Sequence, residues 1–191
     1  MARWAVLISG NGSTLQAVLN NPEWASCRLV ISNKKSAYGL KRAQRAGVQV
    51  VVLPEDLKGK DKRVEAELWI QACLEKHSIS HVFLAGFMWI LSENFVKPWV
   101  GRMFNVHPSL LPKYPGLNSF QLALDAGEKV AGVTVHQVIP EMDAGPILLQ
   151  REVDIPSHRD SDLSHLWLHI NEQKAISDGL RKLALENRRK S

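Results

Sequence analysis

Short apolar runs alternate with helix-like stretches through the first hundred residues, and this alternation constrains the fold more than any other feature of the sequence. The runs at 4–8, 29–31, 48–53, 82–85 and 103–106 predict strands, and the stretches at 14–20, 38–46, 62–77 and 93–99 predict helices. Continuous apolar runs are typical of parallel strands that are covered on both faces. Strand–helix alternation implies right-handed crossovers. The sequence therefore predicts an α/β fold with an open, mostly parallel, twisted sheet and helices on both faces.

The pattern changes after Gly116. A short helix is predicted at 121–126, and longer strands at 132–138 and 147–153 flank a turn at 141–145. These two strands are able to pair antiparallel, and a helical stretch is predicted at 160–187. Because no repeat, low-complexity segment or linker interrupts the chain, we expect one domain over 1–191. We expect its first half, 1–100, to bind a phosphoribosyl group or nucleotide and its second half, 101–191, to carry the chemistry.

Composition narrows the class of protein. The chain has 191 residues, enough to bury a sizeable core. No apolar run approaches the roughly 20 residues that a membrane span needs, and the N-terminus enters the first predicted strand without room for a signal peptide. Cys27 and Cys73 lack the spacing of metal ligands. We therefore expect reduced thiols, no metal, no membrane association and a cytoplasmic protein.

The net charge of +5 is concentrated at the C-terminal end. Residues 181–191 contain five basic residues and one acidic residue, so the rest of the chain is nearly neutral. A basic end on a terminal helix complements the helix dipole and needs no polyanionic partner. This distribution argues against nucleic acid and favours small-molecule substrates, for a protein that is a monomer or a homodimer.

Asn105 and His107 lie two residues apart at the end of the fifth predicted strand. Residues i and i+2 of a strand face the same side, so an amide and an imidazole can converge on one substrate atom. The amide can donate a hydrogen bond to a developing oxyanion, and the imidazole can move a proton near neutral pH. Asp143, 36 residues after His107, would orient the ring and favour its cationic form. These three residues suit acyl transfer to nitrogen.

A plainer interpretation of this Asn-x-His pair is a capped strand or a buried histidine whose hydrogen bonds are satisfied. The prolines at 108, 112 and 115 argue against it, because they end the strand and hold the following loop open. The pair would then sit at an exposed carboxyl end of the sheet, where open α/β folds bind ligands. His136, on a later alternating strand, is interpreted as a sheet histidine that supports this site.

A glycine-rich turn at 10–14 follows the first strand and opens the first helix. Backbone N–H groups at a helix N-terminus form an anion site, and Ser13 or Thr14 can cap the helix or contact a phosphate through a hydroxyl. The pattern is neither a Walker loop nor a complete G-x-G-x-x-G. The turn therefore predicts phosphate binding but does not support a dinucleotide.

Residues 105–116 resemble the signature loop of the folate-dependent formyltransferases, and the similarity continues at 7–13, 84–88, 132–136 and 143–146. The resemblance implies a Rossmann-like formyltransferase fold, no metal, and 10-formyltetrahydrofolate as formyl donor. The N-terminal Gly-Asn-Gly-Ser loop resembles members that formylate a phosphoribosyl amine. It implies N1-(5-phospho-D-ribosyl)glycinamide as acceptor, in purine biosynthesis.

The same resemblance assigns ligand contacts. It implies that Asn105, His107 and Asp143 are catalytic. It implies that Gly12, Ser13, Thr14 and Glu172 bind the phosphoribosyl acceptor. The residues that it places around the folate are Arg63, Met88, Trp89, Ile90, Leu91, Asn105, Ile139, Pro140, Glu141, Met142 and Asp143.

The chain departs from these relatives at several positions. Many of them carry Asn where Thr14 stands, and they usually carry Arg where Trp89 stands. Asn118-Ser119-Phe120 replaces a His-rich segment, which leaves the exact acceptor amine open. A formyltetrahydrofolate hydrolase, a formyltransferase for another amine such as an amino-sugar nucleotide, and a binding module without catalysis are the alternatives. The intact set of Asn105, His107 and Asp143 argues against the last.

Overall fold

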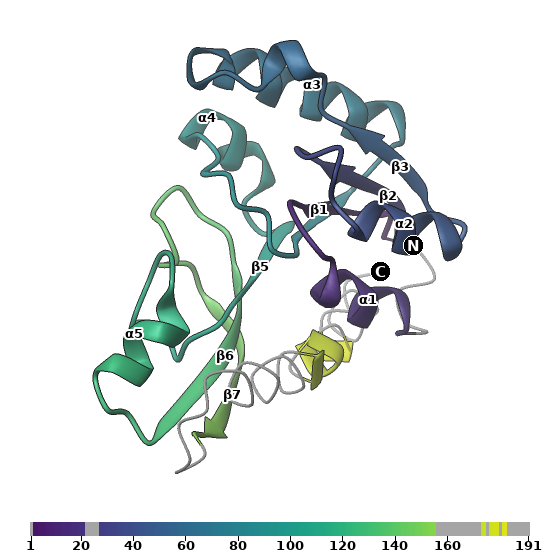
Figure 1. Ribbon diagram of the computed structural model, residues 1–191. Helices are drawn as coiled ribbons and strands as arrows, with labels where there is room; N and C mark the ends of the chain where they lie inside the picture. The colour runs from purple at the N-terminus through teal and green to yellow at the C-terminus, as the bar shows by residue number, and fades with distance from the viewer. Residues whose placement is uncertain (1, 22–26, 156–172, 175, 180, 183–191) are drawn as a thin grey trace.

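The computed structural model describes residues 2–21, 27–155, 173–174, 176–179 and 181–182, and its centre is a seven-stranded sheet in the order β3-β2-β1-β4-β5-β6-β7 (Figure 1). The strands are β1 Trp4–Ile8, β2 Cys27–Ser32, β3 Gln49–Val52, β4 His81–Leu84, β5 Met103–His107, β6 Val130–Gln137 and β7 Ile147–Asp154. Strands β1 to β5 are parallel to one another, whereas β6 is antiparallel to both β5 and β7. The predicted fold class, a mostly parallel sheet with an antiparallel addition, is confirmed.

Side chains of the parallel strands β1 to β5 alternate between two apolar layers. In β1, Trp4, Val6 and Ile8 belong to one core cluster, and Ala5 and Leu7 belong to the other. All five β1 residues are buried, which explains why its sequence is continuously apolar rather than alternating. The sheet is therefore a middle layer between two cores.

Helices cover both faces of the sheet. The helices that contribute buried residues to the cluster of Trp4 are α1 Ser13–Leu19, α2 Gly39–Arg45 and α5 Ser119–Asp125. The helices that pack on the opposite face are α3 Arg63–Lys76 and α4 Glu93–Val96. Short 3-10 turns at Glu55–Leu57 and Lys60–Lys62 lead into α3, and another at Lys97–Trp99 follows α4. Figure 1 shows α3 and α4 on one side of the sheet and α1 on the other.

Most predicted elements are present with shifted ends. The helix predicted at 121–126 begins at Ser119, because Asn118 adopts a left-handed conformation and precedes its first turn. The helix predicted at 93–99 changes to a 3-10 turn at Lys97, since Pro98 lacks the N–H that an α-helix needs there. Residues 173–174, 176–179 and 181–182 are helical, and the rest of the stretch predicted at 160–187 lies outside the described residues. The division into two halves stays a prediction. No described helix is long and apolar enough to cross a membrane.

The carboxyl ends of the five parallel strands meet at one edge. Leu84, the last residue of β4, pairs with Asn105, so β5 continues for two residues beyond its neighbour. On the other side of β5, Asn105 pairs with His136 and His107 pairs with Thr134 of β6. The chemistry-bearing residues predicted from the sequence therefore lie where the sheet changes from parallel to antiparallel.

Candidate active site

Asn105 and His107 share one face of β5. Phe104 and Val106 point into the core cluster on the α1 side, and Met103 points into the cluster on the α3 side. By the strand's two-residue period, Asn105 and His107 take the side of Met103. Asn105 is half-buried, whereas the surrounding strand residues are buried. Amide and imidazole therefore leave the same face of β5, and their convergence on one substrate atom stays a prediction.

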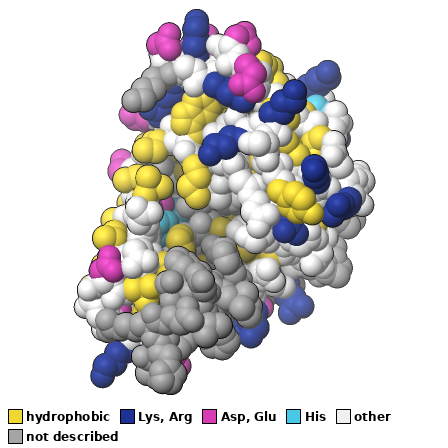
Figure 2. Space-filling view, in the orientation of Figure 1, with side chains coloured by type: hydrophobic (Ala, Val, Ile, Leu, Met, Phe, Trp, Pro, Cys, Tyr) yellow, Lys and Arg dark blue, Asp and Glu magenta, His cyan; other side chains and the backbone are white. Residues whose placement is uncertain are grey.

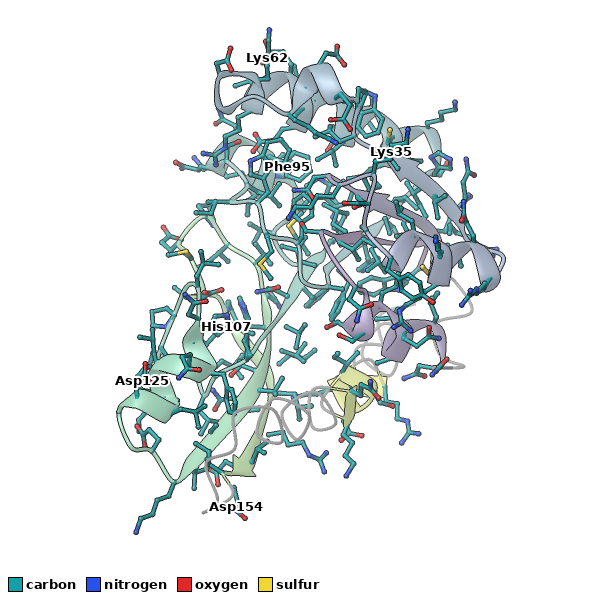
Figure 3. The ribbon with its side chains drawn as sticks, viewed as in Figure 1. Lys35, Lys62, Phe95, His107, Asp125 and Asp154 are labelled. Carbon is teal, nitrogen blue, oxygen red and sulfur yellow. The ribbon has the colours of Figure 1, made fainter. Side chains whose placement is uncertain are left out.

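The His107 ring is enclosed, contrary to the expectation of an exposed pair held open by prolines. His107 is only 5% exposed. Its Nε2 lies 2.9 Å from the Tyr114 carbonyl oxygen and 2.9 Å from Ser119 Oγ, while its Nδ1 lies 3.5 Å from Asp143 Oδ2. His107 lies beside α5 (Figure 3), whose first residue, Ser119, contacts the ring, and Tyr114 of the loop after β5 contacts it as well. The prolines shape this loop, but they do not leave His107 open to solvent.

Both nitrogens of His107 face hydrogen-bond acceptors. The Ser119 hydroxyl donates to the Gly116 carbonyl oxygen at 2.8 Å, so its own oxygen is left to accept from His107 Nε2–H. The Tyr114 carbonyl also accepts only from a protonated Nε2. On the other side of the ring stands the Asp143 carboxylate. A proton on Nε2 serves the Tyr114 and Ser119 oxygens, and a proton on Nδ1 would face the Asp143 carboxylate.

Asp143 lies in the turn between β6 and β7 and is held there by backbone geometry. It has a positive φ of 53°, a conformation that Asp and Asn tolerate better than most residues. Its Oδ2 accepts a hydrogen bond from the Gly116 N–H at 2.8 Å. A Cβ at the neighbouring Gly145 would lie 1.9 Å from the Gln137 carbonyl oxygen, so glycine is required there. These constraints carry the turn back to the His107 loop.

His136 remains uncharged beside this pair. Burial lowers the pKa of His136, although the Gln137 carbonyl and the Asp143 carboxylate act in the opposite direction. Its Nδ1 lies 2.9 Å from the Gln137 carbonyl oxygen, which requires the proton on Nδ1. The bare Nε2 can then accept from the Asn105 amide nitrogen at 3.2 Å. His136 thereby orients Asn105, as the predicted supporting role requires, and its 3.6 Å approach to Asp143 is not an ion pair while the ring is neutral.

A buried polar cluster anchors the loop that encloses His107. The Thr134 hydroxyl, fully buried, donates to the Ser109 carbonyl oxygen at 2.7 Å and accepts from the Leu111 N–H at 3.2 Å. The Gln150 side-chain amide donates to the Leu111 carbonyl oxygen at 2.6 Å and to the Thr134 hydroxyl at 3.1 Å. Strands β6 and β7 thus fix the loop that begins at Pro108.

The predicted phosphate loop packs tightly against α2. Gly12 precedes α1 with φ 74° and is its N-cap, so Ser13 does not cap the helix and Thr14 is buried at 8% exposure. A Cβ on Gly12 would lie 2.6 Å from the Cα of Gly39. Arg42 donates from Nε to the Asn11 carbonyl oxygen at 2.9 Å. The loop is therefore preformed by its neighbour helix.

The predicted folate segments expose large apolar side chains. Met88 is 66% exposed, Ile90 69% and Met142 60%, which is unusual for residues of this size. In Figure 2, hydrophobic side chains gather around a histidine in the left half of the view. Trp89 and Leu91 are half-buried, and Ile139 and Pro140 lead into the turn of Asp143. Such an exposed apolar surface suits a flat ligand.

Arg63, the predicted cation for the folate, is paired within the protein. Its Nε lies 3.3 Å from Glu67 Oε1. Glu67 is 7% exposed and also accepts from the backbone N–H of Ser92, at 2.6 Å, and from its hydroxyl. Ser92 in turn caps α4 through the Phe95 N–H. Arg63 and Glu67 therefore fix the chain directly after the predicted folate segment.

Sequence reasoning missed three contributors and named one that lies outside the described residues. Ser119 was noted only as part of a departure from relatives, although its hydroxyl contacts His107. Ser9 joins the loop after β1 to the segment after β4, accepting from the Met88 N–H at 2.8 Å. Arg42, which contacts the Asn11 carbonyl oxygen, could not be distinguished in the sequence from any other basic residue of a predicted helix. Glu172 falls outside the described residues. Among described residues no cluster of His, Cys, Asp or Glu is placed to hold a metal.

Comparison with known proteins identifies the family. A family profile described as formyl transferase matches residues 2–180. The chain belongs to the formyl transferase family. It is 43% identical to the phosphoribosylglycinamide formyltransferase of Escherichia coli (strain K12) over 154 residues, which cover 78% of this chain and 72% of that protein.

Larger proteins contain a similar segment. The chain is 47% identical to the trifunctional purine biosynthetic protein adenosine-3 of Homo sapiens over 158 residues, 81% of this chain and 15% of that protein. It spans between 14% and 18% of the length of the trifunctional relatives from chicken, human, cattle and Drosophila melanogaster.

Solved formyl transferase structures share the whole fold. Glycinamide ribonucleotide transformylase 1 from Symbiobacterium toebii superposes with a TM-score of 0.90 and 34% identity, covering 97% of this chain and 89% of that one. Phosphoribosylglycinamide formyltransferase from Anaplasma phagocytophilum gives 0.88 and 36%, covering 97% and 88%.

Proposed function

We propose that this formyl transferase moves the formyl group of 10-formyltetrahydrofolate to the primary amine of N1-(5-phospho-D-ribosyl)glycinamide, as a cytoplasmic enzyme of purine biosynthesis. The observation that carries the proposal is the cluster of Asn105, His107 and Asp143, with Asp143 Oδ2 at 3.5 Å from His107 Nδ1. The bacterial relative, which the chain matches over most of both lengths, is a phosphoribosylglycinamide formyltransferase, and this supports the same reaction.

The chemistry follows from the charge that develops in the reaction. Attack of the acceptor amine on the formyl carbon places negative charge on the formyl oxygen. The Asn105 amide and the His107 cation are the groups that stabilise this oxygen, because preorganised donors act most strongly in a water-poor site. Asp143 balances the charge of His107. His136, being neutral, holds the Asn105 amide without competing for that carboxylate.

Proton transfer completes the reaction. The new ammonium must lose a proton, and the departing folate nitrogen must gain one. The side chains of His107 and Asp143 are 6% and 11% exposed, so the pair is largely shielded from bulk water. We propose that His107 and water carry the proton between the two nitrogens.

The two substrates occupy the two loops at the carboxyl edge. The turn at Gly12 and Ser13 receives the phosphate of the acceptor, and the apolar segment at 88–91, with the turn at 139–143, receives the pterin. Pterins are held well by backbone donors and acceptors in an apolar slot. Alignment of amine and donor at this edge supplies an effective-molarity advantage of roughly 7–11 kcal/mol.

An amine-panel assay tests the proposal. The purified protein is mixed with 10-formyltetrahydrofolate and one of several amines, and deformylation is followed at the folate chromophore. We expect turnover only with the phosphoribosyl glycinamide. Equal deformylation without any amine would show a hydrolase, and turnover with an amino-sugar nucleotide alone would show a different acceptor class. Either result contradicts the proposal.

A further inference from the structure

A cavity of about 510 Å³ opens beside the predicted folate segment, at the carboxyl ends of β2, β3 and β4. Residues after β2 and β3 form most of its wall, and Trp89, after β4, forms the remainder. The wall residues that matter to its chemistry are Asn33, Lys34, Lys35, Glu55, Lys58 and Trp89. This volume lies within the range of small-molecule sites, and none of the reaction steps above uses it.

The cavity carries an excess of positive charge. Lys58 pairs with Glu55 at 2.5 Å, and these two charges cancel. Lys34 and Lys35 are exposed, and neither has a carboxylate within salt-bridge distance among the described residues. Figure 3 labels Lys35 in the loop after β2. Two lysines are therefore available to an anionic ligand.

The wall also contains an acceptor and a flat apolar surface. The Asn33 Oδ1 atom is buried without a hydrogen-bond partner in the described structure, and a buried acceptor without a donor is unfavourable. A ligand amide N–H would supply that donor. The half-buried indole of Trp89 offers a surface for an aromatic ring. The cavity thus combines sites for carboxylates, an amide and a ring.

We infer that this cavity binds the glutamate chain of the folate co-substrate, and that Lys34 and Lys35 recognise the carboxylates of the second and later γ-linked glutamates. The inference rests on the proposed function. Trp89 belongs to the segment proposed to hold the folate, so the cavity is continuous with it. Arg63 is not among the wall residues and Trp89 provides no charge, whereas Lys34 and Lys35 are the wall lysines that have no carboxylate partner among the described residues.

The test compares donors that differ only in chain length. KM is measured for 10-formyltetrahydrofolate carrying one glutamate and for the same donor carrying three, with wild-type protein and saturating acceptor. Exposed ion pairs each change affinity by roughly one- to fivefold. We therefore expect KM about three- to tenfold lower for the triglutamate, and we expect 0.5 M salt to remove most of the difference.

Two double variants distinguish recognition by the cavity lysines from a general effect of the protein's positive charge. Lys34→Ala with Lys35→Ala should abolish the chain-length preference and leave KM for the monoglutamate within about twofold. Lys76→Ala with Lys129→Ala removes the same charge from exposed positions outside the cavity wall and should preserve the preference. Equal KM for both donors in the wild type, or a preference that survives Lys34→Ala with Lys35→Ala, overturns the inference.

The outcome stays separable from the proposed function. If neither donor supports transfer to any amine, the proposed function fails. Binding of monoglutamyl and triglutamyl tetrahydrofolate is then measured directly by tryptophan fluorescence. Tighter binding of the triglutamate that depends on Lys34 and Lys35 sustains the cavity assignment, and equal binding rejects it.

Discussion

Replacing Asp143 by Asn should reduce turnover far more than it weakens substrate binding. The carboxylate has two contacts of different kinds: a hydrogen bond from the Gly116 N–H at 2.8 Å, and a charge contact with His107 Nδ1 at 3.5 Å. An Asn side chain is the same size and keeps an oxygen for Gly116. It loses only the negative charge, so the turn should keep its position while the His107 cation loses its counter-ion.

The size of the effect follows from the geometry. Two unit charges about 4 Å apart interact by roughly 4 kcal/mol at an effective dielectric constant near 20. If most of this interaction energy acts only when the oxyanion and the cation are both present, kcat should fall by about a thousandfold. KM for either substrate should change by less than about fivefold, because the interaction lost belongs mainly to the transition state.

Steady-state kinetics over pH 6 to 9, with each substrate varied in turn, measures this. Asp125→Asn is the matched control: Asp125 is exposed on α5 and accepts from Gln121 at 2.8 Å, and its loss should leave kcat unchanged. The double variant of Asp143→Asn with Asn105→Ala should lose less than the two single losses combined, since both groups act on one intermediate. Turnover within tenfold of wild type across neutral pH would make Asp143 a loop-fixing residue only.

Three further changes test other parts of the structure. Gly12→Val puts a branched side chain at φ 74°, with its Cβ 2.6 Å from the Gly39 Cα. KM for the acceptor should rise by about tenfold or more while KM for the folate stays nearly constant. Equal increases in KM for the two substrates would argue against a separate acceptor loop. Thr134→Val leaves its buried partners unsatisfied and should lower the free energy of unfolding in urea by about 2–4 kcal/mol, whereas Thr134→Ser should cost about 1 kcal/mol; equal losses would refute the anchoring role. Burial and the Arg102 guanidinium lower the pKa of His81 from 6.5 to about 4, so the folded state favours the neutral ring. The stability that the neutral ring contributes to the folded state is complete above pH 6.5. That contribution is lost as pH falls toward 4, by about 1–2 kcal/mol after allowance for partial exposure, and His81→Phe should show a flatter acid limb in unfolding measurements; an unchanged limb contradicts the assignment.

The centre of the sheet was predictable because β1, β2 and β4 are mostly buried on both faces. Each run such as 4–8 has to be apolar throughout to fill two cores at once, and that leaves a plain signal in the sequence. The proximity of Asn105 and His107 was predictable for a similar reason, since the two-residue period of a strand fixes it locally. The antiparallel pairing of β6 was less determined, because the sequence at 132–153 allowed that arrangement without requiring it.

Contacts between distant segments were not predictable from local pattern. The enclosure of His107 depends on α5 bringing Ser119 to its ring and on the turn of Asp143 returning to Gly116, 27 residues away in sequence. The cavity beside Trp89 is built by loops after three different strands. Neither arrangement leaves a periodic or compositional signal. The resemblance to the formyltransferases implied in advance that Asp143 acts with His107, but it implied no role for Ser119.

Ser9 shows how the fold itself can set the distance between two substrates. Its N–H donates to the Gly86 carbonyl oxygen at 3.1 Å, and its buried hydroxyl accepts from the Met88 N–H at 2.8 Å. The first loop leads to the turn at Gly12, where the phosphate is proposed to bind, and the second leads to the apolar segment at 88–91, where the folate is proposed to bind. The two loops thus leave neighbouring parallel strands and are joined at once by hydrogen bonds that extend the sheet. If the acceptor and the donor bind as proposed, their separation is fixed by backbone geometry rather than by a flexible side chain. Proximity can contribute roughly 7–11 kcal/mol to a reaction between two bound substrates. The residues that secure it need no chemistry of their own and carry no catalytic signature in the sequence.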